Sequence, residues 1–357
     1  MSDVPDGGES QGLGPRHAAK AVTISDIAAQ AGVSTPTVSR VLNRRSDVSP
    51  QTRQRVEQLL REHGYRRRGT RADERAGLID LVFNDLDSPW AVEVLRGVEA
   101  AAHAAGAGTV VSAIHRRRSS AREWLENLRA RASDGVILVT TALDPDLHAE
   151  LRRLNVPAVV VDPAGVPDLD VPTVGATNWA GGLSATEHLT GLGHRRIGHI
   201  AGRPGLWCSR ARLDGYRAGL ESVALDVDPT LIVPGDFDYA SGFAAGVRLL
   251  DLADPPTAVF AASDEMALGV YEAARRRGLR VPEDLSIVGF DDLPQARWAP
   301  PPLTTVRQPL AEMGMVAVRT VLRLLNDEQL ESSKVELATE VVVRESTAAP
   351  QGTVRSR

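Results

Sequence analysis

Cysteine and lysine are almost absent from this sequence. The 357 residues contain one cysteine, Cys208, and two lysines, Lys20 and Lys334. A single thiol excludes an internal disulfide framework and any zinc or iron–sulfur site held by several thiolates. Neither lysine stands in a Gly-Lys-Ser/Thr string, so the end of a phosphate-binding loop is missing. Disulfide-stabilised scaffolds and P-loop enzymes are therefore excluded.

Long apolar runs and enzyme motifs are missing as well. No window approaches the roughly 18 uninterrupted apolar residues of a membrane span, and residues 1–20 have no apolar run, so we expect a cytoplasmic protein without a membrane partner. No G-x-G-x-x-G follows a strand, and neither G-x-S-x-G nor H-E-x-x-H occurs. His188, His194 and His199 are spaced across glycines in a way that favours a helix end over metal ligation. We expect no catalytic residue, no cofactor and no metal.

The charge divides unevenly along the chain. Residues 1–77 carry 13 Lys and Arg against 9 Asp and Glu, a net charge of +4, whereas the rest of the chain is net −9. Within residues 20–71 there are 11 basic against 4 acidic residues. A basic segment on an acidic remainder indicates that the N-terminal part meets nucleic acid, with an affinity that falls with salt because neutralised phosphates release counterions.

Three short helical patterns follow one another in residues 22–65, after a Gly-, Ser- and Pro-rich leader. The first starts with Thr23 as N-cap, the second with Ser34, and the third with Ser49 followed by a proline. Each pattern carries apolar residues on one face: Ile27, Ala28 and Ala31; Val38, Val41 and Leu42; Val56, Leu59 and Leu60. These patterns predict a compact three-helix domain.

The second helix presents polar side chains suited to DNA. A helix that begins with small polar residues and continues to an arginine can lie in the major groove, where Arg binds guanine and Thr or Ser binds base edges or phosphates. The alternative from the residues alone is an ordinary helical hairpin with a solvated polar face. The DNA contacts that we expect here are Thr23, Ser34, Thr35, Pro36, Thr37, Ser39, Arg40 and Asn43.

From residue 78 onward, apolar strand patterns alternate with helical ones. Continuous apolar runs, typical of parallel strands covered on both faces, begin at residues 78, 109, 135, 158, 196, 258 and 285. Helical stretches occupy 89–105, 178–192, 209–224 and 264–278. This βαβ winding predicts an α/β core of two doubly wound parallel sheets, with a ligand cleft at the carboxyl ends of the strands.

The string TISDIAAQAGVSTPTVSRVLN at residues 23–43 closely resembles the helix-turn-helix of the lactose-repressor/galactose-repressor family. Strings such as LGHRRIGHIAG at 192, SRARLDGYRAGL at 209 and PPLTTVRQP at 301 extend the resemblance over residues 22–347. It implies a small all-α head on a two-lobed, periplasmic-binding-protein-like core. It also implies a transcription regulator, expected to repress carbohydrate-metabolism genes, that binds operator double-stranded DNA as a homodimer and releases it when a sugar binds.

The predicted organisation is a disordered leader (1–21), a helix-turn-helix domain (22–65), a basic hinge (66–77), the effector-binding and dimerisation core (78–347) and a tail (348–357). The hinge departs from the family pattern, in which a Pro-Asn pair and a leucine-bearing helix follow the tyrosine. Here Tyr65 is followed by Arg66, Arg67 and Arg68. Two readings stay open: these arginines enter a narrow minor groove, or they form a solvated tether that touches phosphates only.

A polar residue and an aromatic, Ser88 and Trp90, follow the first strand of the core, and such a pair suits a sugar, which offers both C–H faces and hydroxyls. By resemblance, the same cleft is lined by Arg212, Phe237, Ser263 and Asp291, with Gln308 nearby. The resemblance makes Asp291 an acceptor for hydroxyls, Arg212 a donor and Phe237 a second stacking face.

Each effector residue has a structural alternative. Asp291 can cap a turn, Phe237 can belong to the core, and Arg212 can pair with Asp214 or Glu221. Asp264 is expected to cap the helix that starts there. At the level of function, two further readings stay open: a regulator whose co-repressor is a nucleobase or phosphosugar, and a cytoplasmic enzyme on a Rossmann-like core with an incidental basic head.

Overall fold

The computed structural model describes residues 24–42, 48–63, 75–115, 118–139, 145–163 and 171–351. The chain divides into two compact units, Met1–Glu74 and Arg75–Arg357. The expected leader, most of the expected hinge and the end of the expected tail lie outside the described residues. Among the described residues, no helix is long and apolar enough to cross a membrane.

The first unit contains α1 (Ile24–Ala31), α2 (Thr35–Leu42) and α3 (Pro50–Glu62). Ile27, Val38 and Val56, one from each helix, are fully buried against one another. Two helices begin at their predicted caps, because Ser34 accepts from the backbone N–H of Thr37 at 3.4 Å and Ser49 from that of Thr52 at 3.2 Å. Gly32 ends α1 with a φ of +65°, a conformation that favours glycine. The predicted three-helix head is confirmed.

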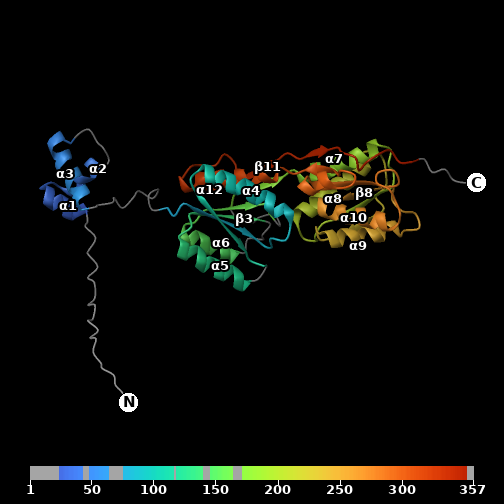
Figure 1. Cartoon of the computed structure of the whole chain (residues 1–357), viewed down its shortest axis with the longest axis horizontal. Coiled ribbons are helices and arrows are strands. Elements are labelled where there is room, and N and C mark those ends of the chain that lie inside the picture. Colours follow the sequence, from blue (N-terminus) through green and yellow to red (C-terminus); the bar gives the residue numbers. More distant parts are fainter. Residues whose placement is uncertain are drawn as a thin grey trace, which may run out of the picture. The chain divides into compact units, whose positions relative to one another are not determined.

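The first lobe of the second unit is a six-stranded sheet between two helical layers (Figure 1). Its strand order is β11-β5-β4-β3-β1-β2, and every pair is parallel. The helices α4 and α12 cover one face and α5 and α6 the other. The strands are β1 Leu78–Phe83, β2 Gly108–Ala113, β3 Gly135–Val139, β4 Ala158–Val161, β5 Thr173–Ala176 and β11 Lys334–Leu337; the helices are α4 Pro89–Ala104, α5 Arg118–Arg131, α6 Pro145–Leu154 and α12 Leu310–Leu325.

The second lobe repeats this plan with strand order β12-β10-β9-β8-β6-β7, in which only β12 is antiparallel to its neighbour. The helices α7 and α8 cover one face and α9 and α10 the other. The strands are β6 Ile197–Ala201, β7 Ile232–Pro234, β8 Ala258–Ala261, β9 Ser286–Asp291, β10 Thr304–Arg307 and β12 Glu340–Val342; the helices are α7 Asn178–Gly191, α8 Trp207–Glu221, η1 Pro229–Leu231, α9 Tyr239–Leu250, α10 Asp264–Arg276 and α11 Pro294–Trp298.

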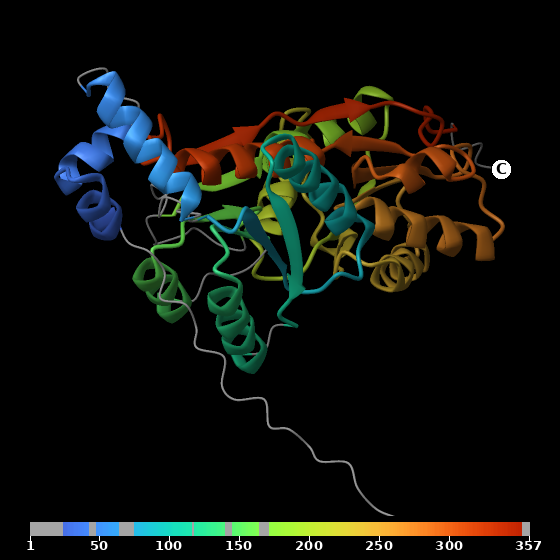
Figure 2. The same ribbon diagram turned by 60° about the vertical axis from the view of Figure 1, so that its left-hand side comes forward.

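The chain passes between the lobes after β5, β10 and β11, and the turned view shows the long connections along one edge (Figure 2). Two of these connections are bonded together, since the backbone N–H of Thr339 donates to the hydroxyl of Thr177 at 2.9 Å. The strand order of each sheet reverses once, between β1 and β3 and between β6 and β8. The predicted class, two doubly wound parallel sheets beside an all-α head, is confirmed.

Some elements were not predicted. The helices α5 and α6 are rich in charge, and the strands β5, β7, β11 and β12 have only three or four residues each. Short strands carry too few residues to show a period, and β11 and β12 lie at sheet edges where alternate side chains are solvated. The missed strands therefore have weak local patterns and owe their place to the sheet around them.

Candidate functional site

The polar residues expected to meet DNA lie along the exposed side of α2. Thr35, Pro36 and Arg40 are exposed, whereas Val38 and Val41 on the opposite side are buried. Ser34 and Thr37 also bond each other through their hydroxyls at 2.9 Å, so the start of the helix is held in place. Thr23, Asn43, Arg66, Arg67, Arg68 and the side chain of Ser39 lie outside the described part of the chain.

A cavity of about 1120 Å³ lies between the two lobes of the core. It is bordered by residues at or just beyond the carboxyl ends of strands from both sheets, including Phe83, Val139 and Asp162 in the first lobe and Ser263 and Asp291 in the second. Ligands of doubly wound sheets bind at these ends, where the strand order reverses. Of the seven expected effector residues, six line the cavity: Ser88, Trp90, Arg212, Phe237, Ser263 and Asp291.

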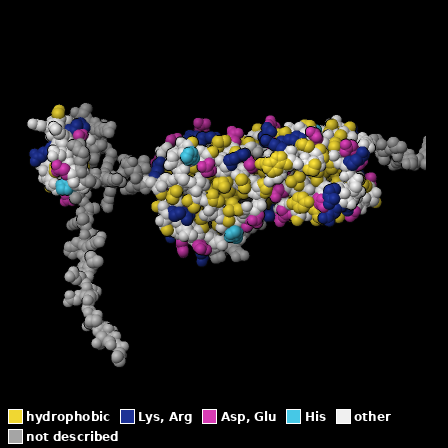
Figure 3. All heavy atoms as spheres, in the orientation of Figure 1, with side chains coloured by type: hydrophobic (Ala, Val, Ile, Leu, Met, Phe, Trp, Pro, Cys, Tyr) yellow, Lys and Arg dark blue, Asp and Glu magenta, His cyan; other side chains and the backbone are white. Residues whose placement is uncertain are grey.

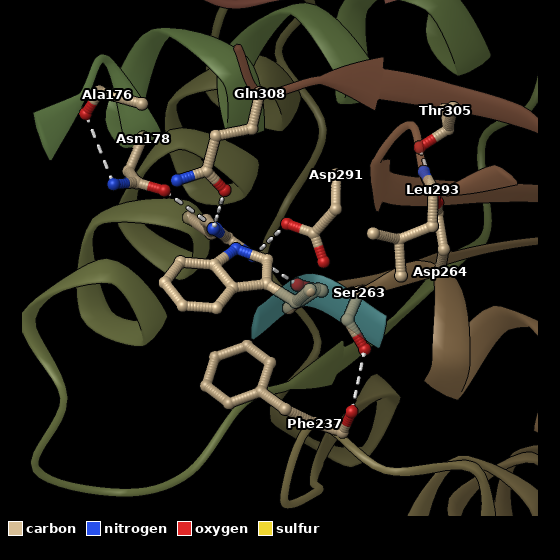
Figure 4. Close-up of polar contacts among 12 residues, drawn as sticks. Ala176, Asn178, Phe237, Ser263, Asp264, Asp291, Leu293, Thr305 and Gln308 are labelled. Atoms are coloured by element: carbon tan, nitrogen blue, oxygen red, sulfur yellow. Dashed lines mark hydrogen bonds and ion pairs between the residues drawn. The ribbon is translucent and has the colours of Figure 1, made fainter. Parts of the chain in front are cut away.

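Arg212, on α8, is the centre of a buried hydrogen-bond network and is itself 3% exposed. Its Nε donates to Oδ1 of Asn178 at 2.8 Å, and its Nη1 donates to the carbonyl of Ala262 at 2.6 Å. Figure 4 shows Asn178, Gln308 and Asp291 turned toward this common point, with Ser263 and Phe237 nearby. The guanidinium is thus fixed before any ligand arrives.

Two further groups complete the network. Arg212 Nη2 donates to Oε1 of Gln308 at 3.0 Å, and its Nη1 lies 3.5 Å from Oδ1 of Asp291. Gln308 stands behind the arginine and is not among the described residues that border the cavity. The alternative that Arg212 pairs with Asp214 or Glu221 is wrong, because its guanidinium is buried and bonds the groups named above.

The aromatic ring of Phe237 lies over Gly202, directly after β6. A Cβ on Gly202 would come within 1.9 Å of that ring, so the approach requires glycine. Phe237 also lies 5.6 Å from the Arg212 guanidinium, and Phe290 covers the guanidinium at 3.7 Å. Phe237 is therefore both packed on the core of the second lobe and open to the cavity, as is Trp90 in the first lobe.

Several carboxyl groups on the cavity wall are desolvated. Burial raises the pKa of Asp291 well above its usual range, although Arg212 opposes the shift. Burial likewise raises the pKa of Asp162, again against Arg212, and a bond from the thiol of Cys208 also opposes it. Burial also raises the pKa of Glu265. Desolvated carboxyls with few donors are suited to a ligand that brings hydroxyl groups.

The two serines of the predicted site hold helix ends. Ser263 caps α10, accepting from the N–H of Met266 at 3.2 Å, and its hydroxyl donates to the carbonyl of Phe237 at 3.3 Å. Ser88 caps α4, accepting from the N–H of Trp90 at 3.2 Å, and its hydroxyl donates to Glu265 of the other lobe at 2.5 Å. Both serines therefore position the walls of the cavity, and both hydroxyl protons are already donated to acceptors of the protein.

The expectation for Asp264 is wrong. The cap of α10 is Ser263, and Asp264 stands in the first turn with a fully buried side chain. Its carboxylate accepts from the hydroxyl of Thr305 at 2.5 Å and from the N–H of Leu293 at 2.8 Å. Burial nevertheless raises the pKa of Asp264 to about 7. The residue ties α10 to the segments after β9 and in β10.

Three residues of the cavity share an unusual backbone conformation. Asp162, Phe237 and Asp291 have positive φ angles of 49°, 67° and 114°. Such conformations cost free energy in residues other than glycine and concentrate at functional sites. Asp162, Asn178 and Glu265 were missed by the sequence argument. The signal available for Asp162 was its place directly after the AVVV strand, near the carboxyl end of a strand as Ser263 and Asp291 are in the other lobe.

The three clustered histidines have separate partners. His188 bonds Thr347 at 3.0 Å, His194 bonds Ser286 at 3.0 Å, and His199 bonds the carbonyl of Phe260 at 3.1 Å. Burial lowers the pKa of His199 to about 3. Across the described ranges, no group of three or more His, Cys, Asp or Glu residues is arranged to hold a metal ion.

A head with an exposed polar helix, followed by a two-lobed core with a buried polar cleft, defines a class of ligand-responsive DNA-binding proteins. The family model for bacterial regulatory proteins of the lacI family matches residues 23–68, and the model for a periplasmic binding protein-like domain matches residues 186–347. The transcriptional repressor CytR of Escherichia coli (strain K12) is 37% identical over 333 residues, which are 92% of this chain and 97% of CytR.

Two solved structures share the architecture. A complex of the transcriptional regulator CelR with cellobiose has a TM-score of 0.70 and 37% identity, covering 91% of this chain and 99% of that one. The lac repressor dimer bound to operator and the anti-inducer ONPF has a TM-score of 0.68 and 31% identity, covering 92% and 100%. This chain belongs to the lacI family of bacterial regulatory proteins. It is a DNA-binding transcription regulator, so the enzyme alternative is wrong.

Proposed function

We propose that this protein is a cytoplasmic repressor that binds operator DNA as a homodimer through α2 and releases it when a sugar occupies the cleft. The observation that supports a sugar ligand is the combination of aromatic rings and desolvated carboxyl groups around one cavity, with one of each in either lobe. Trp90 and Phe237 offer apolar faces for C–H groups, while Asp291 and Asp162 offer acceptors for hydroxyls. The relative CelR was solved with cellobiose, a sugar of this chemistry.

The release is a shift between two populations of the core. A ligand that touches both lobes favours the arrangement in which both sets of contacts are made, and it changes DNA affinity only by its differential affinity for the two arrangements. Such couplings are typically about 1 to 3 kcal/mol. A co-repressor, such as a nucleobase or phosphosugar, would act with the opposite sign and tighten the DNA complex.

The dimer is supported by apolar side chains exposed on the core. Val92 on α4, Val111 on the edge strand β2 and Tyr239 on α9 are 57%, 38% and 48% exposed. On the face drawn in Figure 3, hydrophobic side chains gather over both lobes between charges of mixed sign. Val92 and Val111 lie on the adjoining elements α4 and β2 of the first lobe, and exposed apolar groups beside an unpaired sheet edge favour a surface that another chain covers. Sedimentation of the full chain as a monomer at micromolar concentration would refute this part.

The effector role is tested by titrating the protein calorimetrically with neutral mono- and disaccharides, sugar phosphates and nucleobases. We expect a neutral sugar to bind, and Asp291→Asn to weaken that binding by about tenfold because an amide NH2 group, which only donates, replaces a carboxyl oxygen that can accept from a hydroxyl. The exposed Asp254→Asn serves as the matched control. Binding confined to sugar phosphates or nucleobases, or an unchanged affinity in Asp291→Asn, would remove the proposed sugar site.

A further inference from the structure

The point where the linker joins the core, residues 75–78, is held by one acidic side chain. The carboxylate of Asp134 accepts from three successive backbone N–H groups, those of Ala76 at 3.1 Å, Gly77 at 2.7 Å and Leu78 at 3.2 Å. The N–H of Asp134 donates back to the carbonyl of Leu78 at 2.8 Å. We refer to residues 75–78 as the linker root. The Asp134 carboxylate, together with a bond from the N–H of Gly108 to the carbonyl of Gly77 at 2.6 Å, therefore orients the chain where it enters β1.

The linker root is also bonded to the end of α12. Arg75 Nη2 donates to the carbonyl of Leu325 at 2.5 Å, and its Nη1 donates to Oδ1 of Asn326 at 3.2 Å. The last carbonyls of a helix lack partners within it and carry a partial negative charge, so a guanidinium is favoured there. Arg75 thereby attaches the linker root to the C-terminal end of this helix.

The other end of α12 reaches the effector cleft. Gln308, two residues before Leu310, is 3% exposed and accepts from Arg212 at 3.0 Å. The N–H of Leu310 donates to the carbonyl of Gln308 at 2.8 Å, and the Gln308 amide contacts the sulfur of Met313 at 3.6 Å. The helix has 16 residues, a length of about 24 Å at ~1.5 Å per residue. The helix α12 thus runs from the neighbourhood of Gln308, which lies behind the arginine of the cleft, to the linker root.

The helix α12 cannot slide freely over its neighbour α4. A Cβ on Gly97 would lie 1.8 Å from the carbonyl oxygen of Ala311, and one on Gly314 would lie 2.6 Å from that of Val94. The two backbones are therefore in direct contact, and both figures of the ribbon show the helices together on one face of the sheet (Figures 1 and 2). Since α4 also starts at the cleft, with Ser88, the pair responds to the cleft as one close-packed body.

We propose that Arg75 and Asp134 are positioning residues that couple the effector cleft to the DNA-binding head. When the network around Arg212 changes, Gln308 moves the start of α12, and the end of α12 moves the linker root through Arg75. Asp134 holds the backbone N–H groups of residues 76–78, so a movement of the linker root changes the direction in which the chain enters β1. This inference rests on the proposed function for the origin of the movement, but it concerns contacts that exist without any ligand.

The test is a double-mutant cycle on the full chain, read by hydrogen exchange of the backbone N–H groups of residues 76–78. Gln308→Met removes the acceptor for Arg212 at similar volume, Gln308→Glu keeps an acceptor, and Arg75→Gln removes the attachment to α12. We expect Gln308→Met to accelerate this exchange by about threefold to tenfold in the parent chain and by less than about twofold in Arg75→Gln. Gln308→Glu should leave the exchange near the parent rate.

Equal acceleration in both backgrounds, or none in either, would overturn the proposal. Exchange in β6, residues 197–201, is the internal control, and equal acceleration there would show general destabilisation and also overturn it. Should Gln308→Met fail to fold, Gln308→Asn, which withdraws the amide by one methylene, takes its place in the cycle. No sugar is used, so failure of a sugar to release DNA would refute the proposed function and leave this result unaffected.

Discussion

The head and the core of this protein keep their polar groups in opposite environments. Thr35 and Arg40 on α2 are exposed, and the start of that helix is held by its Ser34 cap. In the core, by contrast, Arg212, Asp291 and Gln308 are 3%, 5% and 3% exposed, and the arginine bonds the other two. Water solvates the exposed polar groups of the head, so they need no partner within the protein. Their favourable contacts form only when DNA binds. Buried polar groups must find their hydrogen-bond partners within the protein, so the network is rigid and the loss of any member destabilises it.

The largest effect should follow from breaking the buried network. Arg212→Ala leaves the carboxyl of Asp291 and the amides of Asn178 and Gln308 without their shared partner, so we expect the free energy of unfolding to fall by about 3 to 5 kcal/mol. Urea unfolding followed by tryptophan fluorescence measures it. Arg210→Ala, an exposed arginine on the same helix, is the control, and a loss below about 1 kcal/mol for Arg212→Ala would contradict a preformed network.

The pH dependence of stability should come from the buried carboxyls of the core. Burial raises the pKa of Asp264 from 3.8 to about 7, so the folded state holds a proton that the unfolded state has released between these values. Stability therefore falls as pH rises from about 4 to about 7, by at most ~1.4 kcal/mol per pH unit for this one proton.

Asp264→Asn removes this titration while keeping an acceptor for the N–H of Leu293, so the decline should be shallower. Urea unfolding between pH 4.5 and pH 7.5 measures the two slopes, with the exposed Asp254→Asn as the matched control. Identical slopes in the parent and Asp264→Asn would mean that Asp264 is already ionised in the folded protein at the lower pH.

In the exposed head, Arg40→Ala should weaken DNA binding alone. An arginine that binds a base edge contributes about 1 to 3 kcal/mol of discrimination, so we expect a weakened preference for the selected DNA and an unchanged free energy of unfolding. Fluorescence anisotropy with a duplex selected by the parent protein measures it, against Arg280→Ala on the core. A comparable loss of cleft-ligand affinity in Arg40→Ala would contradict the division of labour between head and core.

The smallest effect should follow from the helix cap of the head. Ser34→Ala removes the acceptor for the N–H of Thr37 and should lower the stability of the head by about 1 kcal/mol. Thermal unfolding followed by circular dichroism measures it, with Ser34→Thr, which retains a hydroxyl, as the comparison. If both variants unfold at the parent temperature, the cap does not stabilise the start of α2.

The contrast between the exposed head and the buried core also explains which structural features could be predicted from the sequence. The head was predictable because its information is local: caps, a glycine stop and apolar residues at helical spacing define α1, α2 and α3. The strand patterns likewise predicted both sheets. In the core, Arg212 is joined to Asn178, Ala262 and Gln308, which lie 34, 50 and 96 residues away, and only the topology brings them together.

Asp162 is the clearest example of a site residue that could not be predicted from the sequence. It lies at the carboxyl end of a short apolar strand, as Ser263 and Asp291 do in the other lobe, but nothing local marks its burial or its contact with Cys208. Asp264 was misassigned for a related reason, since an aspartate at the start of a helix is usually a cap and here the preceding serine fills that role. Burial, which decides both cases, is a property of the assembled lobes.

Whether the buried cleft controls the exposed head can be decided by measuring DNA affinity with and without a sugar. A duplex selected from a random pool is titrated with the full chain by fluorescence anisotropy, in the presence of the neutral sugar found by calorimetry. We expect the sugar to weaken DNA binding by about tenfold, a coupling of ~1.4 kcal/mol, and Asp291→Asn to abolish the change without altering DNA affinity in the absence of sugar. A sugar that fills the cleft and leaves DNA affinity unchanged, or raises it, would contradict the account.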